Sequence, residues 1–211
     1  MQHNGQSVAP VIVVVDDDPH IRDGLNILFQ SVGLTSKAFS SPSELLQSNL
    51  PDRVSCLILD VRMPELSGLD FQAELAKAQI DTPIIFITGH GDIPMTEKAM
   101  KAGAVEFLTK PVREQDLLDA VRVALERDRS KREHDREAHD LRARFDALSS
   151  REQQVMELVC AGLMNKQSAA QIGVSEVTVK VHRHNVMKKL GAKSLADLVR
   201  MGASLGIPRK K

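Results

Sequence analysis

Short apolar runs alternate with amphipathic stretches along the first 126 residues of the chain. Runs of four or five mostly aliphatic residues, bounded by acids or turn residues, are typical of buried strands. They cover residues 11–15, 56–59, 83–87 and 105–108, and the more polar residues 34–38 could form a further short strand. The segments that follow them repeat apolar residues at helical spacing, which predicts helices at residues 21–33, from 42 onward, and at 69–78, 95–101 and 113–127. Five β-α units of this kind predict a doubly wound α/β domain, in which helices cover both faces of a five-stranded parallel sheet.

From residue 148 onward the pattern is helical throughout, which predicts a small all-α domain. Ser149 and Glu152 stand at capping-box spacing ahead of its first helix. The tight turn Gly173-Val174-Ser175 separates two further helices and predicts a helix-turn-helix. We expect the helices of this domain to cover residues 150–162, 165–172, 176–190 and 195–203.

A segment dense in charge and poor in Gly and Pro lies between the two patterns. Its apolar residues Ala138, Leu141 and Phe145 continue to Leu148 at spacings of 3, 4 and 3, which allows either a short coiled-coil seam or a solvated helical linker. We favour the linker, because a coiled coil needs three or more heptads. The expected organisation is therefore a tail, an α/β domain, a charged helical linker and a helix-turn-helix domain, at residues 1–9, 10–126, 127–146 and 147–211.

Charge is distributed unevenly, although the net charge of the whole chain is zero. Residues 1–126 hold 10 basic and 18 acidic residues, a balance of −8. Residues 147–211 hold 11 basic and 4 acidic residues, a balance of +7. A basic domain joined to an acidic one suggests two different partners, of which the basic domain would bind a polyanion, with nucleic acid the first candidate.

Composition excludes several other classes of protein. The longest apolar stretch, residues 11–15, is too short to span a membrane, and residues 1–7 lack the apolar core of a signal peptide. We therefore expect a cytoplasmic protein with no membrane partner. Cys56 and Cys160 form neither a CxxC pair nor a disulfide framework, and we expect both to be buried core residues.

Polar residues end four of the predicted strands, and the carboxyl ends of parallel strands meet at one edge of a sheet. These residues are Asp16, Asp17, Asp60, Thr88 and Lys110. Carboxylates that lie close together repel one another unless a hard cation such as Mg²⁺ is present. One of the acids could then act as a nucleophile toward a phosphoryl group, whose oxygens would pair with the lysine and the threonine.

Residues 10–126 resemble a receiver domain of the FixJ type, which has a flavodoxin-like fold. The resemblance is carried by Val15-Asp16-Asp17-Asp18, Asp60-Val61-Arg62-Met63-Pro64, Thr88-Gly89-His90-Gly91-Asp92 and Lys110-Pro111. It implies phosphorylation of Asp60 by a sensor histidine kinase, and Mg²⁺ held by Asp16, Asp17, Asp60 and the backbone carbonyl of Arg62.

The same resemblance assigns roles to the remaining residues of this edge. Lys110 would pair with the phosphoryl group, and its bond to Pro111 would be cis. Thr88 and Phe107 would form a switch pair that reports phosphorylation; a phenylalanine at 107 excludes a switch that needs a phenol hydroxyl. We further hypothesise that Arg62 and His90 tune the lifetime of the phosphoryl group. Asp18 is expected either to cap a helix or to lie behind the acids that bind the metal, and it is not assigned as a direct ligand.

The second helix of the predicted helix-turn-helix has two distinct faces. An apolar stripe of Val179, Val186, Met187 and Leu190 should face the core. The opposite face is basic and includes one apolar residue able to touch a thymine methyl group, Val181. The candidates for phosphate contacts are Lys166, Arg183, Lys189 and Lys193. His182 should pack between helices.

Residues 148–200 resemble the LuxR/NarL-type output domain. The match is carried by residues 148–152, by Gly162-Leu163-Met164-Asn165-Lys166 and by residues 174–183. It implies that Lys180, Val181 and His184 enter the major groove and that the last helix pairs two copies on DNA. The DNA-binding residues predicted in all are Lys166, Thr178, Lys180, Val181, Arg183, His184 and Lys188.

Together these features predict a two-component response regulator that is no enzyme beyond its own phosphorylation and dephosphorylation. Its phosphorylated homodimer would bind double-stranded promoter DNA and, with RNA polymerase, activate transcription. One rival is an aspartate-nucleophile phosphatase, but Arg62 stands where such an enzyme needs a second acid. A second rival is an adaptor whose helix-turn-helix no longer binds DNA. A third is constitutive DNA binding without phosphorylation.

Overall fold

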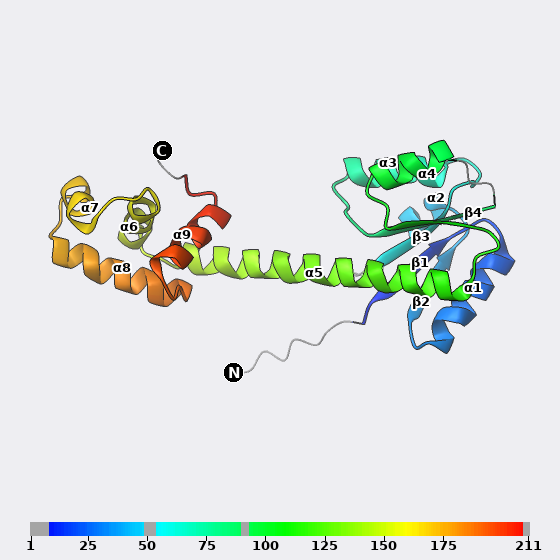
Figure 1. Cartoon of the computed structure of the whole chain (residues 1–211), viewed down its shortest axis with the longest axis horizontal. Coiled ribbons are helices and arrows are strands. Elements are labelled where there is room, and N and C mark those ends of the chain that lie inside the picture. Colours follow the sequence, from blue (N-terminus) through cyan, green and yellow to red (C-terminus); the bar gives the residue numbers. More distant parts are fainter. Residues whose placement is uncertain (1–8, 49–53, 90–92, 209–211) are drawn as a thin grey trace. The chain divides into compact units, whose positions relative to one another are not determined.

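A computed structural model describes residues 9–48, 54–89 and 93–208. The chain divides into two compact units, Met1–Lys131 and Arg132–Lys211, which are called here the α/β unit and the helical unit. Figure 1 labels the elements of both. No helix among the described residues is both long and apolar enough to cross a membrane.

The α/β unit is built on a five-stranded parallel sheet of order β2-β1-β3-β4-β5. Val15 lies opposite Leu59, and Asp60 lies opposite Ile87, so the strands end almost level with one another. The predicted doubly wound fold is therefore confirmed. Strands β2, β4 and β5 are shifted by one residue from the predicted ranges, and β3 is one residue longer. The strands are β1 (Val11–Val15), β2 (Thr35–Phe39), β3 (Cys56–Asp60), β4 (Ile84–Thr88) and β5 (Glu106–Thr109).

Helices cover both faces of this sheet, which explains why its central strands are apolar throughout. Val13 and Val15 pack toward one face, whereas Ile12 and Val14 pack toward the other, as the two-residue repeat of a strand requires. Figure 1 shows the two layers of helices. The first face is covered by α2 (Pro42–Gln47), α3 (Gly68–Lys77) and α4 (Ile93–Lys101), and the second by α1 (Pro19–Ser31) and α5 (Glu114–Asp146).

Polar side chains cap the N-termini of the first three helices. Asp18, Ser41 and Ser67 each accept a hydrogen bond from a backbone N–H in the first turn of α1, α2 and α3. Such caps satisfy donors that have no partner within the helix. The expected capping role of Asp18 is therefore confirmed.

Helix α5 continues without a break from Glu114 to Asp146 and so includes the whole of the predicted linker. Leu141 and Phe145, with Leu148 beyond the helix end, pack against the core of the helical unit, whereas Ala138 is exposed. The apolar residues at coiled-coil spacing therefore serve the core of their own unit. This packing and the charged, exposed residues 133–140 support the linker interpretation over the coiled-coil seam.

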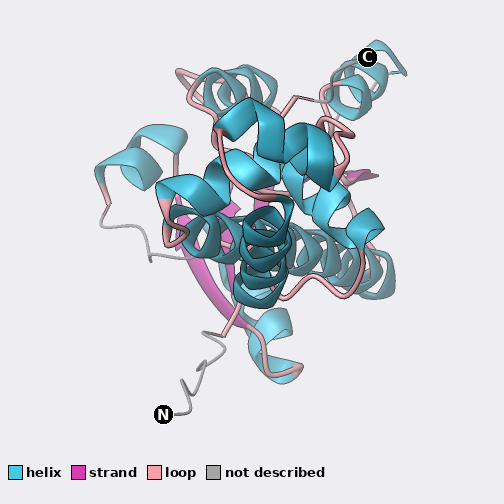
Figure 2. Ribbon diagram, turned by 90° about the vertical axis from the view of Figure 1, so that its left-hand side faces the viewer, coloured by secondary structure: helices cyan, strands magenta, loops and turns pink. Residues whose placement is uncertain are grey.

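The helical unit consists of the end of α5 and four shorter helices. In Figure 2 helices and strands have different colours, and the strands of the described chain all belong to the α/β unit. Ser149 and Glu152 form the predicted capping box. Gly173 adopts a left-handed conformation (φ 69°) and makes the predicted turn. The helices are α6 (Ser150–Cys160), α7 (Asn165–Ile172), α8 (Glu176–Leu190) and α9 (Leu195–Ser204). Cys56 and Cys160 are both free and buried, as expected.

Gly68, the first residue of α3, lies directly against the end of β3. A Cβ atom at this position would come within 2.3 Å of the backbone carbonyl oxygen of Asp60. The Gly68 N–H also donates to the carbonyl oxygen of Val61 at 3.1 Å. The absence of a side chain here therefore lets α3 pack onto the residue predicted to be phosphorylated.

We predict that Gly68→Ala lowers the free energy of unfolding of the α/β unit by about 2 kcal/mol, because the added methyl group forces α3 and β3 apart. Gly24→Ala is the matched control, since Gly24 is exposed within α1 and an added Cβ meets nothing. It should raise stability by about 0.5–1 kcal/mol, the difference in helix propensity. Urea unfolding followed by circular dichroism measures both, because the chain has no Trp or Tyr for fluorescence. Equal effects of the two substitutions would contradict the packing described.

Candidate functional site

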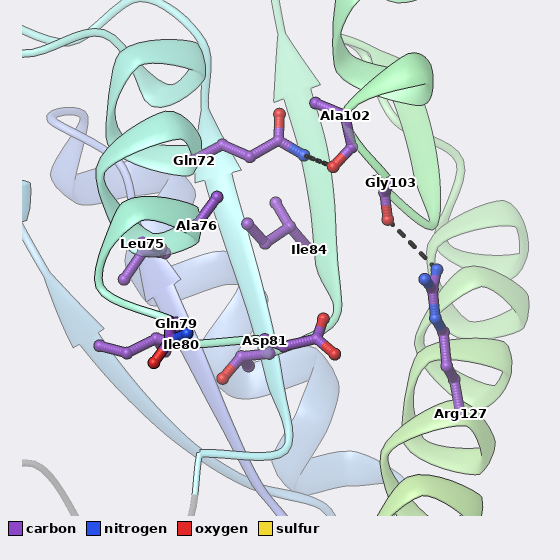
Figure 3. A pocket seen from close by; sticks show the side chains of 11 residues that line it. Gln72, Leu75, Ala76, Gln79, Ile80, Asp81, Ile84, Ala102, Gly103 and Arg127 are labelled. Atoms are coloured by element: carbon purple, nitrogen blue, oxygen red, sulfur yellow. Dashed lines mark hydrogen bonds between the residues drawn. The ribbon is translucent and has the colours of Figure 1, made fainter. Parts of the chain in front are cut away.

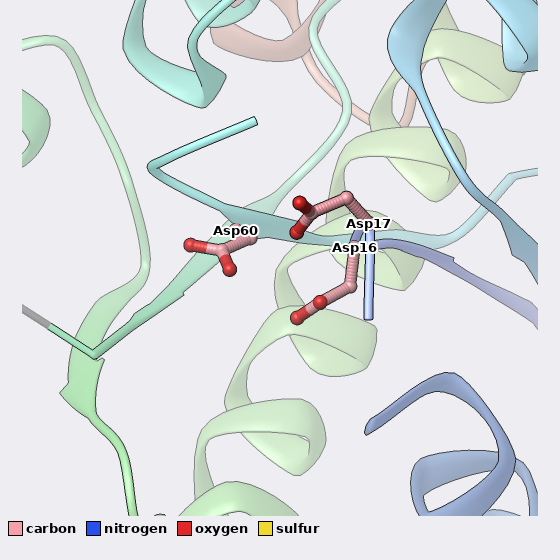
Figure 4. A group of neighbouring side chains, drawn as sticks. All are labelled: Asp16, Asp17 and Asp60. Carbon is pink, nitrogen blue, oxygen red and sulfur yellow. The ribbon is translucent and has the colours of Figure 1, made fainter. Parts of the chain in front are cut away.

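The predicted acids and the predicted lysine meet at the carboxyl edge of the sheet. Asp16 follows β1, Asp60 is the last residue of β3, and Lys110 follows β5. Carboxylate oxygens of Asp16, Asp17 and Asp60 all lie within 4.8 Å of one another, and Figure 4 shows the three side chains together. Asp16 and Asp60 are buried, whereas Asp17 is exposed. The cluster thus has two enclosed acids and one acid open to solvent.

The ammonium group of Lys110 bridges the two buried acids. Its Nζ lies 2.7 Å from Oδ2 of Asp16 and 2.7 Å from Oδ2 of Asp60. The remaining oxygens accept backbone hydrogen bonds, Oδ1 of Asp16 from the N–H of Asp18 at 2.9 Å and Oδ1 of Asp60 from the N–H of Arg62 at 3.0 Å. Each buried carboxylate is therefore held by one backbone amide and by one shared cation.

Burial raises the pKa of the Asp16 carboxylate, so a further positive charge beside it would be favourable. Loss of solvent raises the pKa of Asp16, and its hydrogen bonds with Lys110 and the Asp18 amide do not fully offset this effect. Burial also disfavours the ammonium of Lys110, but hydrogen bonds with Asp16 and Asp60 outweigh it and raise the pKa of Lys110. The lysine therefore stays protonated at neutral pH, while Asp16 would gain from a further cation.

Thr88 and Phe107, the predicted switch pair, lie on the adjacent strands β4 and β5. Thr88 is fully buried at the end of β4, and Phe107 is half-buried. The ring of Phe107 lies 6.1 Å from that of Phe86, its partner across the two strands, at a tilt of 42°. The switch residue on β5 is thus packed against the strand that carries Thr88.

Two other predictions concern the loops around the acids. The peptide bond between Lys110 and Pro111 is cis, as expected. The side chain of Arg62 is exposed next to Asp60. His90, predicted to tune the lifetime of the phosphoryl group together with Arg62, lies outside the described residues.

Arg22 is a contact residue of this site that the sequence analysis missed. Its Nη1 donates to the backbone carbonyl of Asp16 at 2.7 Å and to that of Asp17 at 2.9 Å. One guanidinium group on α1 therefore fixes the loop that carries both acids. The only sequence signal was a basic residue near the start of a helix, where acids are usually preferred. That signal does not show which carbonyls the side chain reaches.

A pocket of about 400 Å³ lies at the opposite edge of the sheet, beside Ile84 at the start of β4. Figure 3 shows the Gln72 amide donating to the carbonyl of Ala102, and Arg127 donating to the carbonyl of Gly103. The pocket shares no residue with the acid cluster. The candidate phosphoryl site therefore lies at the other edge of the sheet and does not coincide with this pocket.

Helix α8 has one buried apolar face and one exposed basic face, as predicted. Val179, Val186 and Leu190 are fully buried in the core of the helical unit, and Met187 packs against it. The predicted DNA-facing residues on the opposite face are exposed: Lys180, Val181, His184 and Lys188. On α7, Lys166 is also exposed. His182 is half-buried between these faces, in agreement with the predicted packing role.

Several polar residues near this face have partners within the unit. Thr178 Oγ1 lies 2.8 Å from Oγ of Ser175, the residue that caps α8. Arg183 donates to Asn165 at 3.4 Å. These contacts tie two of the predicted DNA-binding residues to neighbouring segments.

Lys189, a candidate for a phosphate contact, is exposed but forms an ion pair within the helical unit. Its Nζ lies 2.7 Å from Oε2 of Glu152, the buried acid of the capping box. The hydrogen bond with Lys189, followed by that with the Ser149 amide, lowers the pKa of Glu152. Lys189 thus joins α8 to the start of α6.

An α/β unit with this edge, followed by a helix-turn-helix unit, defines a receiver domain with a DNA-binding output domain. Residues 12–122 match the family model "Response regulator receiver domain", and residues 146–202 match "Bacterial regulatory proteins, luxR family". The chain therefore belongs to the two-component response regulators that carry a LuxR-type DNA-binding domain.

Named relatives share this organisation along nearly their whole length. Nodulation protein W of Bradyrhizobium diazoefficiens is 58% identical over 205 residues, which cover 97% of this chain and 90% of that protein. The transcriptional regulatory protein FixJ of Rhizobium meliloti is 41% identical, with coverages of 92% and 95%. Among solved structures, the response regulator StyR matches with a TM-score of 0.80 and 47% identity, covering 93% of this chain and 99% of that one.

The raised pKa of Asp16 predicts that Asp16→Asn stabilises the protein at pH 7 when no divalent cation is present. The ionised carboxylate destabilises the folded state above its ordinary pKa, and below that pKa the group is protonated in both states, so the gain should shrink as pH falls. Urea unfolding in EDTA at pH 7 and at pH 4 measures this difference. Asp23→Asn, at an exposed position of α1, is the control and should change stability little. A less stable Asp16→Asn protein at pH 7 would contradict the prediction.

Proposed function

We propose that a sensor histidine kinase transfers a phosphoryl group to Asp60, and that the phosphorylated protein binds promoter DNA as a homodimer and activates transcription. The observation that carries this proposal is the ammonium group of Lys110, held 2.7 Å from both Asp16 and Asp60. A nucleophilic carboxylate, a second acid and a fixed cation at one edge form the arrangement that phosphoryl transfer needs.

The proposed transfer uses two side chains of this chain directly, Asp60 and Lys110. An oxygen of Asp60 attacks the phosphorus atom, the bond from phosphorus to the imidazole nitrogen of the kinase breaks, and the electron pair remains on that nitrogen. Lys110 shares its charge between two carboxylates before the transfer. It is therefore within reach of a phosphoryl oxygen on Asp60 and would balance part of the added negative charge.

The acid cluster also fits a magnesium ion. Its donors are three carboxylates within 4.8 Å of one another, which is the oxygen-rich environment that Mg²⁺ prefers. Asp16, Asp17 and Asp60 would hold the ion, with the Arg62 carbonyl as a further ligand. The ion would supply charge neutralisation at the phosphoryl oxygens. The raised pKa of Asp16 supports the same assignment, since a bound cation stabilises the ionised form.

The Thr88 and Phe107 pair would report phosphorylation to the face of the α/β unit that contains β5 and α5. The Thr88 hydroxyl would turn toward the phosphoryl group, and the Phe107 ring would follow into the space beside it. The close pairing of β4 with β5 supports this coupling. The change would favour a homodimer, in which two output domains meet two DNA half-sites.

The exposed face of α8 would lie in the major groove. Lys180, Val181 and His184 would contact bases, while Lys166, Arg183 and Lys188 would contact phosphates and Thr178 would lie beside them. RNA polymerase would be recruited to the bound promoter. We place this activity in the cytoplasm and assign the protein no enzymatic activity beyond its own phosphorylation and dephosphorylation.

Labelling with radioactive acetyl phosphate in the presence of Mg²⁺ tests the phosphorylation step. We expect Asp60→Asn to abolish labelling because the nucleophilic oxygen is lost, and EDTA to abolish it in the wild type. Asp81→Asn changes an acid near the opposite edge of the sheet and should be labelled normally. Labelled Asp60→Asn protein would place the phosphoryl group elsewhere and overturn the assignment.

DNA selection with the protein before and after acetyl phosphate treatment tests the output step. Lys188→Ala should weaken binding to the selected DNA evenly across sequences and reduce the salt slope by about one, as the loss of one phosphate contact does. Lys77→Ala, at an exposed site on α3, is the matched control. Salt-independent binding would favour an adaptor. Asp60→Asn protein that binds as tightly as the phosphorylated wild type would show constitutive binding.

A further inference from the structure

The exposed face of α8 contains a second valine that the predicted DNA contacts do not include. Val177 is 69% exposed and Val181 is 53% exposed. The two are four residues apart and so lie on the same side of the helix. With Lys180, His184 and Lys188 they form what is called here the reading face, whose five members are all exposed.

Val177 has no evident structural role in the helical unit. It is absent from the residues that form the core or pack against it. The start of α8 is already fixed by Ser175, whose hydroxyl accepts from the Thr178 N–H at 3.1 Å. A β-branched residue is also a poor helix former at an exposed position. Local stability therefore does not explain a valine at this position.

The first turn of α8 has few polar groups left to contact a base. The Thr178 hydroxyl pairs with that of Ser175. Glu176 lies 3.4 Å from the ammonium of Lys180 and carries the charge that DNA phosphates repel. Val177 is thus an exposed apolar group in the part of a recognition helix whose residues usually contact base edges.

We infer that Val177 and Val181 together contact the 5-methyl groups of two thymines in the major groove. This inference rests on the proposed DNA binding and names the base that the face selects. Thymine presents a methyl group in the major groove, and the other three bases do not. The flanking basic side chain of Lys188 complements the phosphates and would bring the apolar pair against the base edges.

The spacing of the two valines sets the spacing of the two thymines. Four residues of α-helix advance about 6 Å along the axis, whereas successive base pairs are about 3.4 Å apart. A helix lying along the groove therefore places the two methyl contacts about two base pairs apart. Each half-site should accordingly contain two thymines, on neighbouring or next-neighbouring base pairs.

The test uses the full-length phosphorylated protein and its selected DNA, in which each thymine is replaced in turn by deoxyuridine. This replacement removes only the 5-methyl group. We expect two positions of the half-site to lose about fourfold in affinity each, the effect of one buried methyl group. Val177→Ala should abolish the loss at one of these positions and leave it at the other, and Val181→Ala should do the reverse.

The control and the alternative outcomes keep the test decisive. Val123→Ala, at a valine that is 54% exposed on α5 of the α/β unit, should leave both losses intact. If Val177→Ala retains both losses, the inference is wrong and the proposed function stands. If Val177→Ala binds DNA as the wild type does but fails to activate transcription, Val177 contacts a protein and the inference is wrong. If the wild-type protein selects no DNA at all, the proposed function fails, and the inference fails with it.

Discussion

Carboxylates gathered at one edge of a sheet repel one another, and the shared ammonium of Lys110 is the interaction that holds this edge together. Asp16 and Asp60 come from different strands and each give one oxygen to the same nitrogen. Backbone amides of Asp18 and Arg62 hold the other oxygens. The chain thereby satisfies two buried acids without neutralising the cluster, because a single positive charge faces three negative ones. The edge therefore keeps a surplus of negative charge, which a further cation would balance.

The rest of the α/β unit can be understood as the support for that edge. Two layers of helices exclude water from the sheet, so that the carboxylate of Asp16 is fully buried at its end. Arg22 fixes the loop of the two adjacent acids, and Gly68 lets α3 lie against the backbone of Asp60. These contacts reduce the freedom of the acids before any substrate arrives. Groups held in place in this way need less rearrangement when a ligand or a reacting group arrives.

The helical unit is organised by a similar pairing of a buried acid with a lysine. Glu152 closes the cap at the start of α6 and at the same time accepts from Lys189 on α8. The recognition helix is therefore held on its inner side by an ion pair and by buried valines, while its outer side stays free of core contacts. A helix fixed in this way can present Val177, Val181 and His184 to DNA without having to become ordered on binding.

The sequence alone determined the parallel sheet and which of its strands end in an acid, a threonine or a lysine. It also determined the helix-turn-helix and the meeting of the acids at one edge. These follow from local rules: apolar period, capping residues and the convergence of parallel strand ends. It also predicted the buried cysteines and the cap at Asp18, which depend on a residue's own chemistry and its immediate neighbours.

Only the tertiary structure decided which partners the long side chains reach. Arg22 on the carbonyls of Asp16 and Asp17 and Lys189 on Glu152 depend on loop paths and helix packing that no spacing encodes. It also assigned Leu141 and Phe145 to the core of the helical unit, although their spacing equally allowed a seam between two chains. The reason is the same in each case: a local pattern shows which face of an element is apolar or charged, but the packing of distant elements determines what that face meets.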